Sequence, residues 1–473
     1  MSTAYDEVQY PTTAFRQTSP DRLATHATLL GLPFAPPGRC RLLDIGGGDA
    51  MNVIAMAVTH PGSEFVSFDL SQSAVRRGQA AIDALGLTNV SVQVADVQSF
   101  DPGPEPFDYI IAHGFYSWIP PEAREATLAL MRRNLAPTGV AFLSFNAHPG
   151  GHIRQIVRDL MLIEVKGITD PVERALRARR KLQAVVADYP ETDVFRRALK
   201  TRCQVVLEVP EAVLLHDDLA EISQPFYLHE VLERAAAHGL GFLTEADPTR
   251  AMEGLLPEGA QDDGGLDVAA RAQEQDFRIM HGFRQTLLVR AETVIDRRQD
   301  PTRLANLYVA SPSRAEGPNS FDTGQRHFEV ADPELARAIT RMAEAWPCAV
   351  PVAGLVEGPE RLAALLRMYA ADLVQLHVEP SPFTTTVSER PTASPLVRLQ
   401  IAQGETRLIT LSHSVTRTED SLGRAFISCL DGSRTHAEIA AHMAELAGSP
   451  LEAVAAKLPE RLESLARMPM LVG

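Results

Sequence analysis

The alternation of short apolar runs with helix-compatible segments in the first 150 residues most constrains the fold of this chain. Helical composition occupies 49–60, 71–86 and 120–136, between apolar runs at 41–47, 64–70, 90–96, 107–114 and 139–146. Strands joined by crossover helices form a parallel, doubly wound sheet whose strand carboxyl ends share one edge. The pattern therefore predicts an α/β, Rossmann-like fold with a ligand site at that edge.

The first apolar run ends in a glycine turn that reads Asp44-Ile45-Gly46-Gly47-Gly48-Asp49-Ala50. Glycines there let a ligand approach the backbone, although many α/β proteins use such glycines only to turn the chain. A dinucleotide fingerprint needs a third glycine at position 51, which is Met51, and dehydrogenases usually keep an apolar side chain where Asp44 stands. The turn therefore disfavours a nicotinamide dehydrogenase, and Asp44 suits a cationic group such as an α-ammonium.

Acidic residues also end the next two predicted strands. Asp69 is placed to accept hydrogen bonds from two ribose hydroxyls, and Asp96 from an exocyclic adenine amine. Each acid taken alone could instead cap a helix or a turn. Together with Asp44 they suit an ammonium, a ribose and an adenine without a pyrophosphate, which is the shape of S-adenosylmethionine.

Several longer stretches resemble bacterial class I methyltransferases that carry a methyltransferase regulatory domain, a family that includes protein-lysine methyltransferases. They include RCRLLDIGGGDAMNVIAMAV, FDYIIAHGFYSWIPPEAR, LAPTGVAFLSFNAHPGGHIRQIVRDLM and, nearer the end, LDGSRTHAEIAA. The resemblance implies S-adenosylmethionine as cofactor, S-adenosylhomocysteine as product and a protein lysine as the leading acceptor. The cofactor contacts that it implies are Asp44, Gly46, Gly48, Asp49, Asp69, Asp96 and His113. We add Asn52, Leu70 and Val97 to this predicted site, and Tyr10 and Thr18 as parts of an N-terminal strap or lid.

The sequence departs from the family pattern near the expected acceptor. Gly47 and Ala50 replace a cysteine and a glycine, and Ser19 replaces a histidine. After Asn146 the family usually has PGW-H, whereas this chain has Gly150-Gly151-His152. The missing aromatic at 151 favours an alternative acceptor, a small molecule or a biosynthetic peptide.

The catalytic candidates lie at the ends of the fourth and fifth strands: His113, Tyr116, Trp118 and Asn146. Tyr116 and Trp118 could form an aromatic wall around a cationic amine, with core packing as the alternative for Trp118. His113 could be a base, or could orient the backbone or the cofactor. No metal site is expected. A non-catalytic scaffold protein that binds the cofactor is the alternative of another class.

The rest of the chain predicts a modular protein. A catalytic domain is expected over 1–292, where strands at 241–247 and 283–290 complete a seven-stranded sheet and regulatory-domain resemblance covers about 210–290. A helical insertion with a basic segment occupies about 150–225, either as a lid or acceptor platform or with those charges simply solvated. Winged-helix-like modules are expected over 300–380 and 396–473 (an α+β region), suited to packing, dimerisation or peptide capture.

Charge and composition limit the classes of partner that we expect for this chain. The chain has 45 Lys and Arg against 60 Asp and Glu, a net charge of −15, which disfavours nucleic acid. No apolar run is long enough to span a bilayer, and no secretory signal is visible. We therefore expect a cytoplasmic enzyme that acts on a protein or peptide acceptor or on a small molecule. A homodimer is compatible with this expectation.

Overall fold

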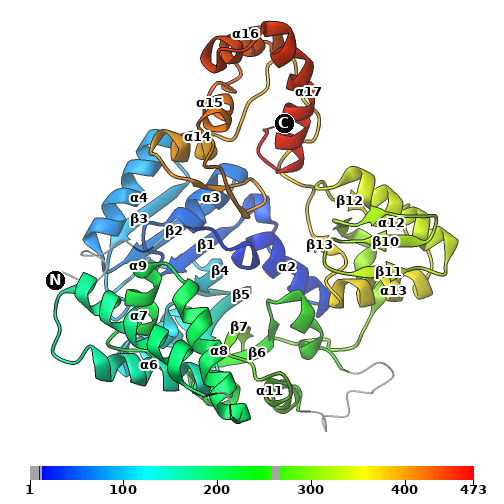
Figure 1. Ribbon diagram of the computed structural model, residues 1–473. Helices are drawn as coiled ribbons and strands as arrows, with labels where there is room; N and C mark the ends of the chain where they lie inside the picture. The colour runs from blue at the N-terminus through cyan, green and yellow to red at the C-terminus, as the bar shows by residue number, and fades with distance from the viewer. Residues whose placement is uncertain (1–9, 11–12, 191, 257–266, 473) are drawn as a thin grey trace.

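The computed structural model describes residues 10, 13–190, 192–256 and 267–472. Its centre is a seven-stranded sheet in the order β3-β2-β1-β4-β5-β7-β6, in which β7 alone runs antiparallel to its neighbours β5 and β6 (Figure 1). The strands are β1 (Arg41–Ile45), β2 (Glu64–Asp69), β3 (Val90–Val94), β4 (Phe107–Ala112), β5 (Leu135–Asn146), β6 (Leu240–Glu245) and β7 (Phe283–Arg290). The predicted Rossmann-like, seven-stranded sheet is confirmed.

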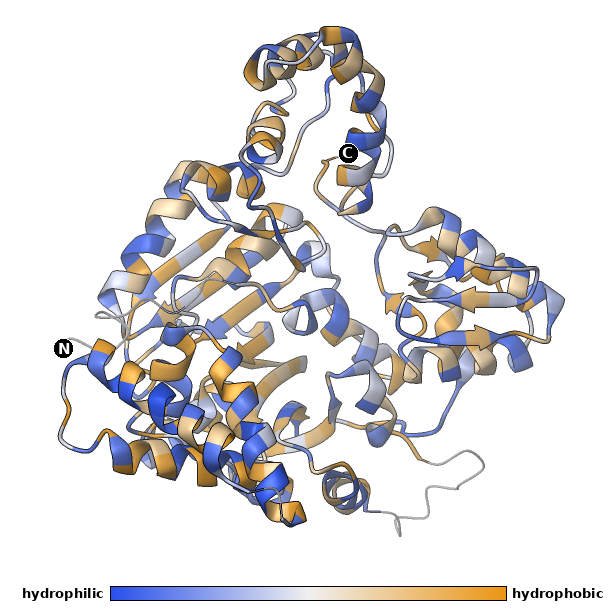
Figure 2. Cartoon of the chain, viewed as in Figure 1, coloured by the Kyte–Doolittle hydropathy of each residue, from blue (hydrophilic) through white to orange (hydrophobic). Residues whose placement is uncertain are grey.

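The sheet forms because its strands carry apolar side chains on both faces, as covered strands must. Adjacent Leu42 and Leu43 are both fully buried and enter different cores on opposite faces. One core is completed by α2 (Pro20–Leu29), α3 (Met51–Thr59) and α4 (Gln72–Leu85), and the other by α5 (Pro121–Asn134), α10 (Leu228–Ala237) and α11 (Val268–Ile279). Figure 2 shows the resulting hydrophobic centre of the sheet.

Local signals set several element boundaries. The Ser71 hydroxyl accepts a hydrogen bond from Ala74 N at 3.2 Å and caps α4, which Gly86 ends in the left-handed conformation with a φ of 63°. β5 begins earlier than the sequence pattern predicts, because Leu135 already pairs with Phe107 ahead of the apolar run.

The insertion after β5 is helical and has its own core. It consists of α6 (Gly151–Glu164), α7 (Pro171–Asp188), α8 (Val194–Glu208), the short α9 (Glu211–Val213) and the π-helix η4 (Leu214–Asp218). Within its basic segment, Arg174 donates to Leu219 O at 3.1 Å and Arg179 donates to Leu207 O at 2.8 Å. These two arginines therefore stabilise the packing of the insertion.

A middle module follows the catalytic sheet. It contains α12 (Pro333–Ala345), α13 (Pro359–Ala370) and two three-stranded sheets, built from β8 (Tyr308–Ala310), β12 (Val350–Pro351) and β13 (Gln375–His377), and from β9 (Arg314–Ala315), β10 (Ser320–Asp322) and β11 (His327–Glu329). It is joined to α2, because Arg22 donates to Leu376 O at 3.1 Å and His377 lies 2.8 Å from Asp21. Its likeness to a winged helix stays a prediction.

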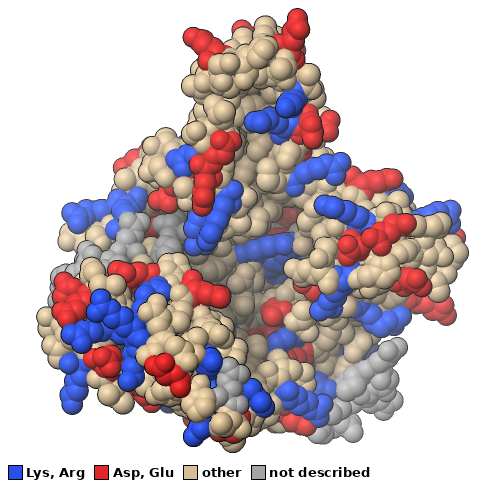
Figure 3. Space-filling view, viewed as in Figure 1, with Lys and Arg blue, Asp and Glu red and all other residues tan. Residues whose placement is uncertain are grey.

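The C-terminal module combines helices with a hairpin. It comprises α14 (Pro395–Ala402), the hairpin of β14 (Arg407–Ile409) and β15 (Val415–Arg417), α15 (Ser421–Ser428), α16 (His436–Ala447) and α17 (Leu451–Arg467), which continues through Pro459. His413 lies 3.2 Å from the Thr59 hydroxyl at the end of α3. In the space-filling view the three parts surround a hollow, and acidic and basic side chains are intermixed over this face (Figure 3). Among the described residues, no helix is both long and apolar enough to cross a bilayer.

Candidate active site

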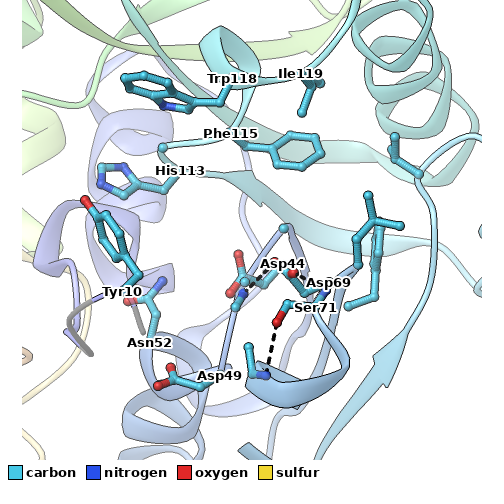
Figure 4. A pocket seen from close by; sticks show the side chains of 18 of the residues that line it. Tyr10, Asp44, Asp49, Asn52, Asp69, Ser71, His113, Phe115, Trp118 and Ile119 are labelled. Carbon is cyan, nitrogen blue, oxygen red and sulfur yellow. Dashed lines mark hydrogen bonds between the residues drawn. The ribbon is translucent and has the colours of Figure 1, made fainter. Parts of the chain in front are cut away.

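A cavity of about 660 Å³ opens at the carboxyl ends of the parallel strands. It gathers residues that are far apart in the sequence, and Figure 4 shows Tyr10, His113 and Trp118 along one side of it and Asp44, Asp69 and Ser71 grouped below. The predicted residues that line it are Tyr10, Asp44, Gly46, Gly48, Asp49, Asn52, Asp69, Leu70, Asp96, Val97, His113, Trp118 and Asn146. Thr18 and Tyr116 are the two predicted site residues that do not.

The glycine turn lines the cavity, and at Gly46 and Gly47 it has no room for side chains. A Cβ atom at Gly46 would lie 2.2 Å from the Phe115 ring, and one at Gly47 would lie 2.2 Å from the Ser67 hydroxyl. Gly48 has a φ of 59°, which glycine adopts without strain, and its N–H donates to Asp69 at 2.9 Å. The turn therefore exposes backbone, rather than side chains, to a ligand.

Asp44 is the most unusual group in the cavity. Its side chain is buried, and its Oδ2 has no hydrogen-bond partner among the described residues. Burial, helped by the nearby charge of Asp69, raises the pKa of Asp44 to about 7. A buried, unpaired carboxylate is costly unless a cation is supplied, and the α-ammonium of S-adenosylmethionine is such a cation.

Asp69 and Asp96 are held by backbone N–H groups. Asp69 accepts hydrogen bonds from Gly48 N and from Ser71 N, the latter at 2.8 Å, and Asp96 accepts from Gln98 N at 2.9 Å. An ionised carboxylate can accept about four hydrogen bonds, so these contacts are compatible with ribose and adenine donors as well. The turn-capping role and the ligand role of these acids are therefore not exclusive.

The N-terminal strap lines the cavity with Tyr10 and Phe15, whereas Thr18 lies behind Asn52 of α3. Thr18 is fully buried, and its hydroxyl accepts a hydrogen bond from Asn52 Nδ2 at 3.1 Å. Asn52 Oδ1 in turn accepts from Phe15 N at 2.9 Å. Thr18 therefore holds Asn52 in place from behind, and Phe15 and Tyr10 line the cavity.

The turn after β4, η3 (Tyr116–Trp118), places its two aromatic residues differently. Tyr116 is completely buried in the core, with its ring centroid 5.5 Å from that of Phe226, and takes no part in the cavity. Trp118 lines the cavity. The expected aromatic wall therefore excludes Tyr116, because a tight 3₁₀ turn directs residues two apart to different sides.

His113 lies in apolar surroundings at the end of β4. Its ring centroid is 3.8 Å from that of Phe15, and its Nδ1 has no hydrogen-bond partner among the described residues. Burial lowers the pKa of His113 to about 4, so the ring is neutral at pH 7. A neutral imidazole can accept a hydrogen bond or a proton, but this pKa makes it a weak base.

Two charged cavity residues from the helical insertion, Arg154 in α6 and Asp217 in η4, were not predicted from the sequence, and neither was Arg77 in α4. Arg154 donates to Asn146 Oδ1 at 3.2 Å, and its guanidinium lies 5.6 Å from the centre of the Trp118 ring. The helical insertion therefore supplies part of the cavity wall. No local sequence signal marks Arg154 or Asp217, since they come together only when the insertion folds.

The missing aromatic at position 151 has a structural explanation. Gly151 starts α6 and is buried, and a Cβ atom there would lie 2.9 Å from Pro225 Cβ. Glycine thus allows α6 to pack closely against the segment that precedes α10.

Three family models match the chain in separate places. One described as a methyltransferase domain matches residues 42–139, one described as a predicted methyltransferase regulatory domain matches 210–290, and one described as the PKMT C-terminal winged helix domain matches 389–461. The first match contains Asp44, Asp69 and Asp96, the three acids at the strand ends.

Similar proteins occur in Rickettsia. The chain is 30% identical to the uncharacterized protein RP028 of Rickettsia prowazekii over 234 residues, which are 49% of this chain and 93% of RP028. It is also 30% identical to the uncharacterized protein RP789 of that organism over 296 residues, 62% of this chain, and so spans about half of RP789, 54%.

The solved structures of PKMT2 from Rickettsia typhi share the fold. One covers 98% of this chain and 100% of PKMT2 with a TM-score of 0.86 at 21% identity, and a second, of PKMT2 in complex with AdoHcy, has a TM-score of 0.85 at 20% identity. With the cavity and the matched domains, these likenesses confirm the predicted resemblance. The chain belongs to the S-adenosylmethionine-dependent class I methyltransferases that carry a methyltransferase regulatory domain and a C-terminal winged helix domain.

Proposed function

We propose that this protein transfers a methyl group from S-adenosylmethionine to the side-chain nitrogen of a lysine in a protein substrate. The observation that carries the cofactor half of the proposal is the buried, unpaired Asp44 carboxylate beside the glycine turn. In this arrangement Asp44 would hold the α-ammonium, Asp69 the ribose hydroxyls and Asp96 the adenine amine.

The lysine half of the proposal is supported by likeness and by the character of the cavity. PKMT2, whose fold this chain shares, and the matched PKMT winged helix domain both point to that acceptor class. Trp118 and Phe283 supply aromatic surface to the cavity that Asp217 also lines, a setting suited to a cationic amine.

The bound cofactor supplies an electrophilic methyl group, so the protein mainly has to align the acceptor and exclude water. Tyr10 and Phe15 from the strap and Trp118 from η3 cover the cavity beside the strand ends. His113 is neutral and can accept a hydrogen bond near the acceptor without repelling its charge. These residues bind and orient; none of them needs to form a covalent intermediate.

The test is transfer of radiolabelled methyl from S-adenosylmethionine to a bacterial extract, followed by mass spectrometry of the labelled species. Label on lysine side chains, lost in the Asp44→Asn variant, supports the proposal. Label confined to a small molecule or to a short biosynthetic peptide would favour that acceptor class instead. Binding of S-adenosylhomocysteine without any transfer would favour a non-catalytic scaffold.

A further inference from the structure

The helical insertion forms one wall of the cavity, and it contributes the carboxylate of Asp217, which is not among the proposed cofactor contacts. Asp217 lies in the π-helix η4 and lines the cavity together with Trp118, Asn146 and Arg154. Its side chain keeps 24% of its surface exposed, so it is accessible from the cavity. A π-helix is rare and often occurs at functional sites.

The charge of Arg154 is directed mainly to other groups. Its Nε lies 2.8 Å from the Asp218 carboxylate and its Nη1 lies 3.2 Å from Asn146 Oδ1, whereas its Nη2 is 3.9 Å from Asp217. Asp218 is the buried member of the acidic pair. Asp217 is therefore the less well neutralised carboxylate, and it is the one on the cavity wall.

The other charged groups around this wall also leave Asp217 less well neutralised than Asp218. Burial raises the pKa of Asp217 to about 6 despite the opposing effect of Arg154; Asp218 also raises it, and a hydrogen bond from Tyr10 lowers it. Arg158 and Arg202, from α6 and α8, interact electrostatically with Asp218. At pH 7 and above Asp217 is thus mostly ionised, with its negative charge only partly offset.

We infer that Asp217 is a specificity-determining residue that binds the ammonium group of the acceptor, an inference that rests on the proposed lysine methylation. Aromatic surface from Trp118 and a carboxylate from Asp217 are the combination that recognises an alkylammonium. The same wall disfavours acceptors that carry a carboxylate or a phosphate, because Arg154 is already paired.

Asp217 acts here as an anchor rather than as the base. A lysine ammonium has a pKa of about 10.4, some four units above that of Asp217, so transfer of its proton to this carboxylate is strongly uphill. Asp217 therefore governs acceptor binding, and the acceptor proton leaves by way of water.

The experiment uses n-butylammonium, which reproduces the end of a lysine side chain, and the full-length protein saturated with S-adenosylhomocysteine. Saturation-transfer NMR measures its binding to the wild type, to Asp217→Asn and to Asp159→Asn, an exposed acid of the same insertion that serves as the matched control. We expect at least a fivefold weaker affinity for Asp217→Asn and an unchanged one for the control. Neutral n-butanol should bind all three proteins equally.

A pH series on the wild type gives an independent measurement. Butylammonium stays charged from pH 5 to 8, so with S-adenosylhomocysteine kept saturating at every pH its affinity should fall as pH drops through about 6 and Asp217 takes up a proton. Equal affinity of the wild type and Asp217→Asn, or a flat profile over this range, overturns the inference. Because no turnover is needed, a failure here is distinct from a failure of the methylation assay.

Discussion

The carboxylate of Asp69 accepts a hydrogen bond from the backbone N–H of Gly48 at 2.9 Å, which joins the end of β2 to the glycine turn after β1. A residue proposed to bind ribose thus also fixes the shape of the turn that receives the rest of the cofactor. The charge of Asp69 also helps to raise the pKa of the nearby Asp44.

Asp69→Ala should weaken S-adenosylhomocysteine binding more than tenfold, because it removes both a ligand acceptor and the acceptor for Gly48 N. Asp69→Asn should lose less, since one amide oxygen can still accept from the backbone. Calorimetry on both variants, with the circular dichroism spectrum as the check on folding, measures the difference. Wild-type affinity in Asp69→Ala would refute the ribose assignment.

Asp44→Asn should stabilise the cofactor-free protein while weakening cofactor binding. The pKa of Asp44 in the folded protein, about 7, lies above the unfolded value of about 3.9, so its ionised form opposes folding at pH 8. Removing that charge should raise the free energy of unfolding by roughly 2–4 kcal/mol, as measured by denaturant titration. Asp83→Asn, an exposed acid on α4, is the control; a destabilised Asp44→Asn protein would contradict the argument.

Cofactor affinity should depend on pH through the same residue. Only ionised Asp44 can pair with an α-ammonium, so S-adenosylhomocysteine affinity should rise as pH increases through about 7 and level off above it. Below that pH each unit should weaken binding by up to about tenfold. Calorimetry between pH 5.5 and 8.5 tests this, and Asp44→Asn should lack the dependence.

Trp118→Ala should reduce turnover or raise the KM for the acceptor, with S-adenosylhomocysteine affinity changed less. Tyr116→Phe should leave turnover within about twofold of the wild type, because its ring lies in the core and outside the cavity. Steady-state kinetics on both variants with the acceptor found by labelling makes the comparison. A large loss of turnover in Tyr116→Phe with a normal melting temperature would contradict the conclusion that Tyr116 serves only the core.

Arg284→Met should destabilise the protein by about 3–5 kcal/mol. Arg284 is fully buried in β7, with its guanidinium 2.9 Å from Asp276 and 2.8 Å from Glu245, and both carboxylates are buried too. Losing the arginine leaves buried negative charge with too few partners. Arg278→Met, which removes an exposed ion pair with Glu274, should cost less than about 1 kcal/mol in the same denaturant titration.

The sheet was predictable because its signals are local. The hydrophobic periodicity is a property of each element itself. The glycine turns and the caps, such as Ser71 and Gly86, lie within a few residues of the elements that they define. The acids at the strand ends were also predictable, since parallel strands bring their carboxyl ends to one edge. The lining of the cavity at the strand ends therefore follows from the sequence almost residue by residue.

The wall where we propose that the acceptor binds depends on contacts between distant segments. Arg154 and Asp217 meet only because α6 and η4 pack within the insertion, and no spacing in the sequence indicates this. Tyr116 was misplaced because the sequence pattern does not say which way a short 3₁₀ turn directs each ring. Thr18 lies one layer behind Asn52, a distinction that requires the packed structure.

The most direct test of the central claim is a pair of calorimetric titrations of the purified protein at pH 8, one with S-adenosylhomocysteine and one with NAD⁺. We expect one-to-one binding of S-adenosylhomocysteine and no binding of NAD⁺, because the acids at the strand ends would repel the negatively charged pyrophosphate. Absence of S-adenosylhomocysteine binding, or equal affinity for both ligands, would contradict it.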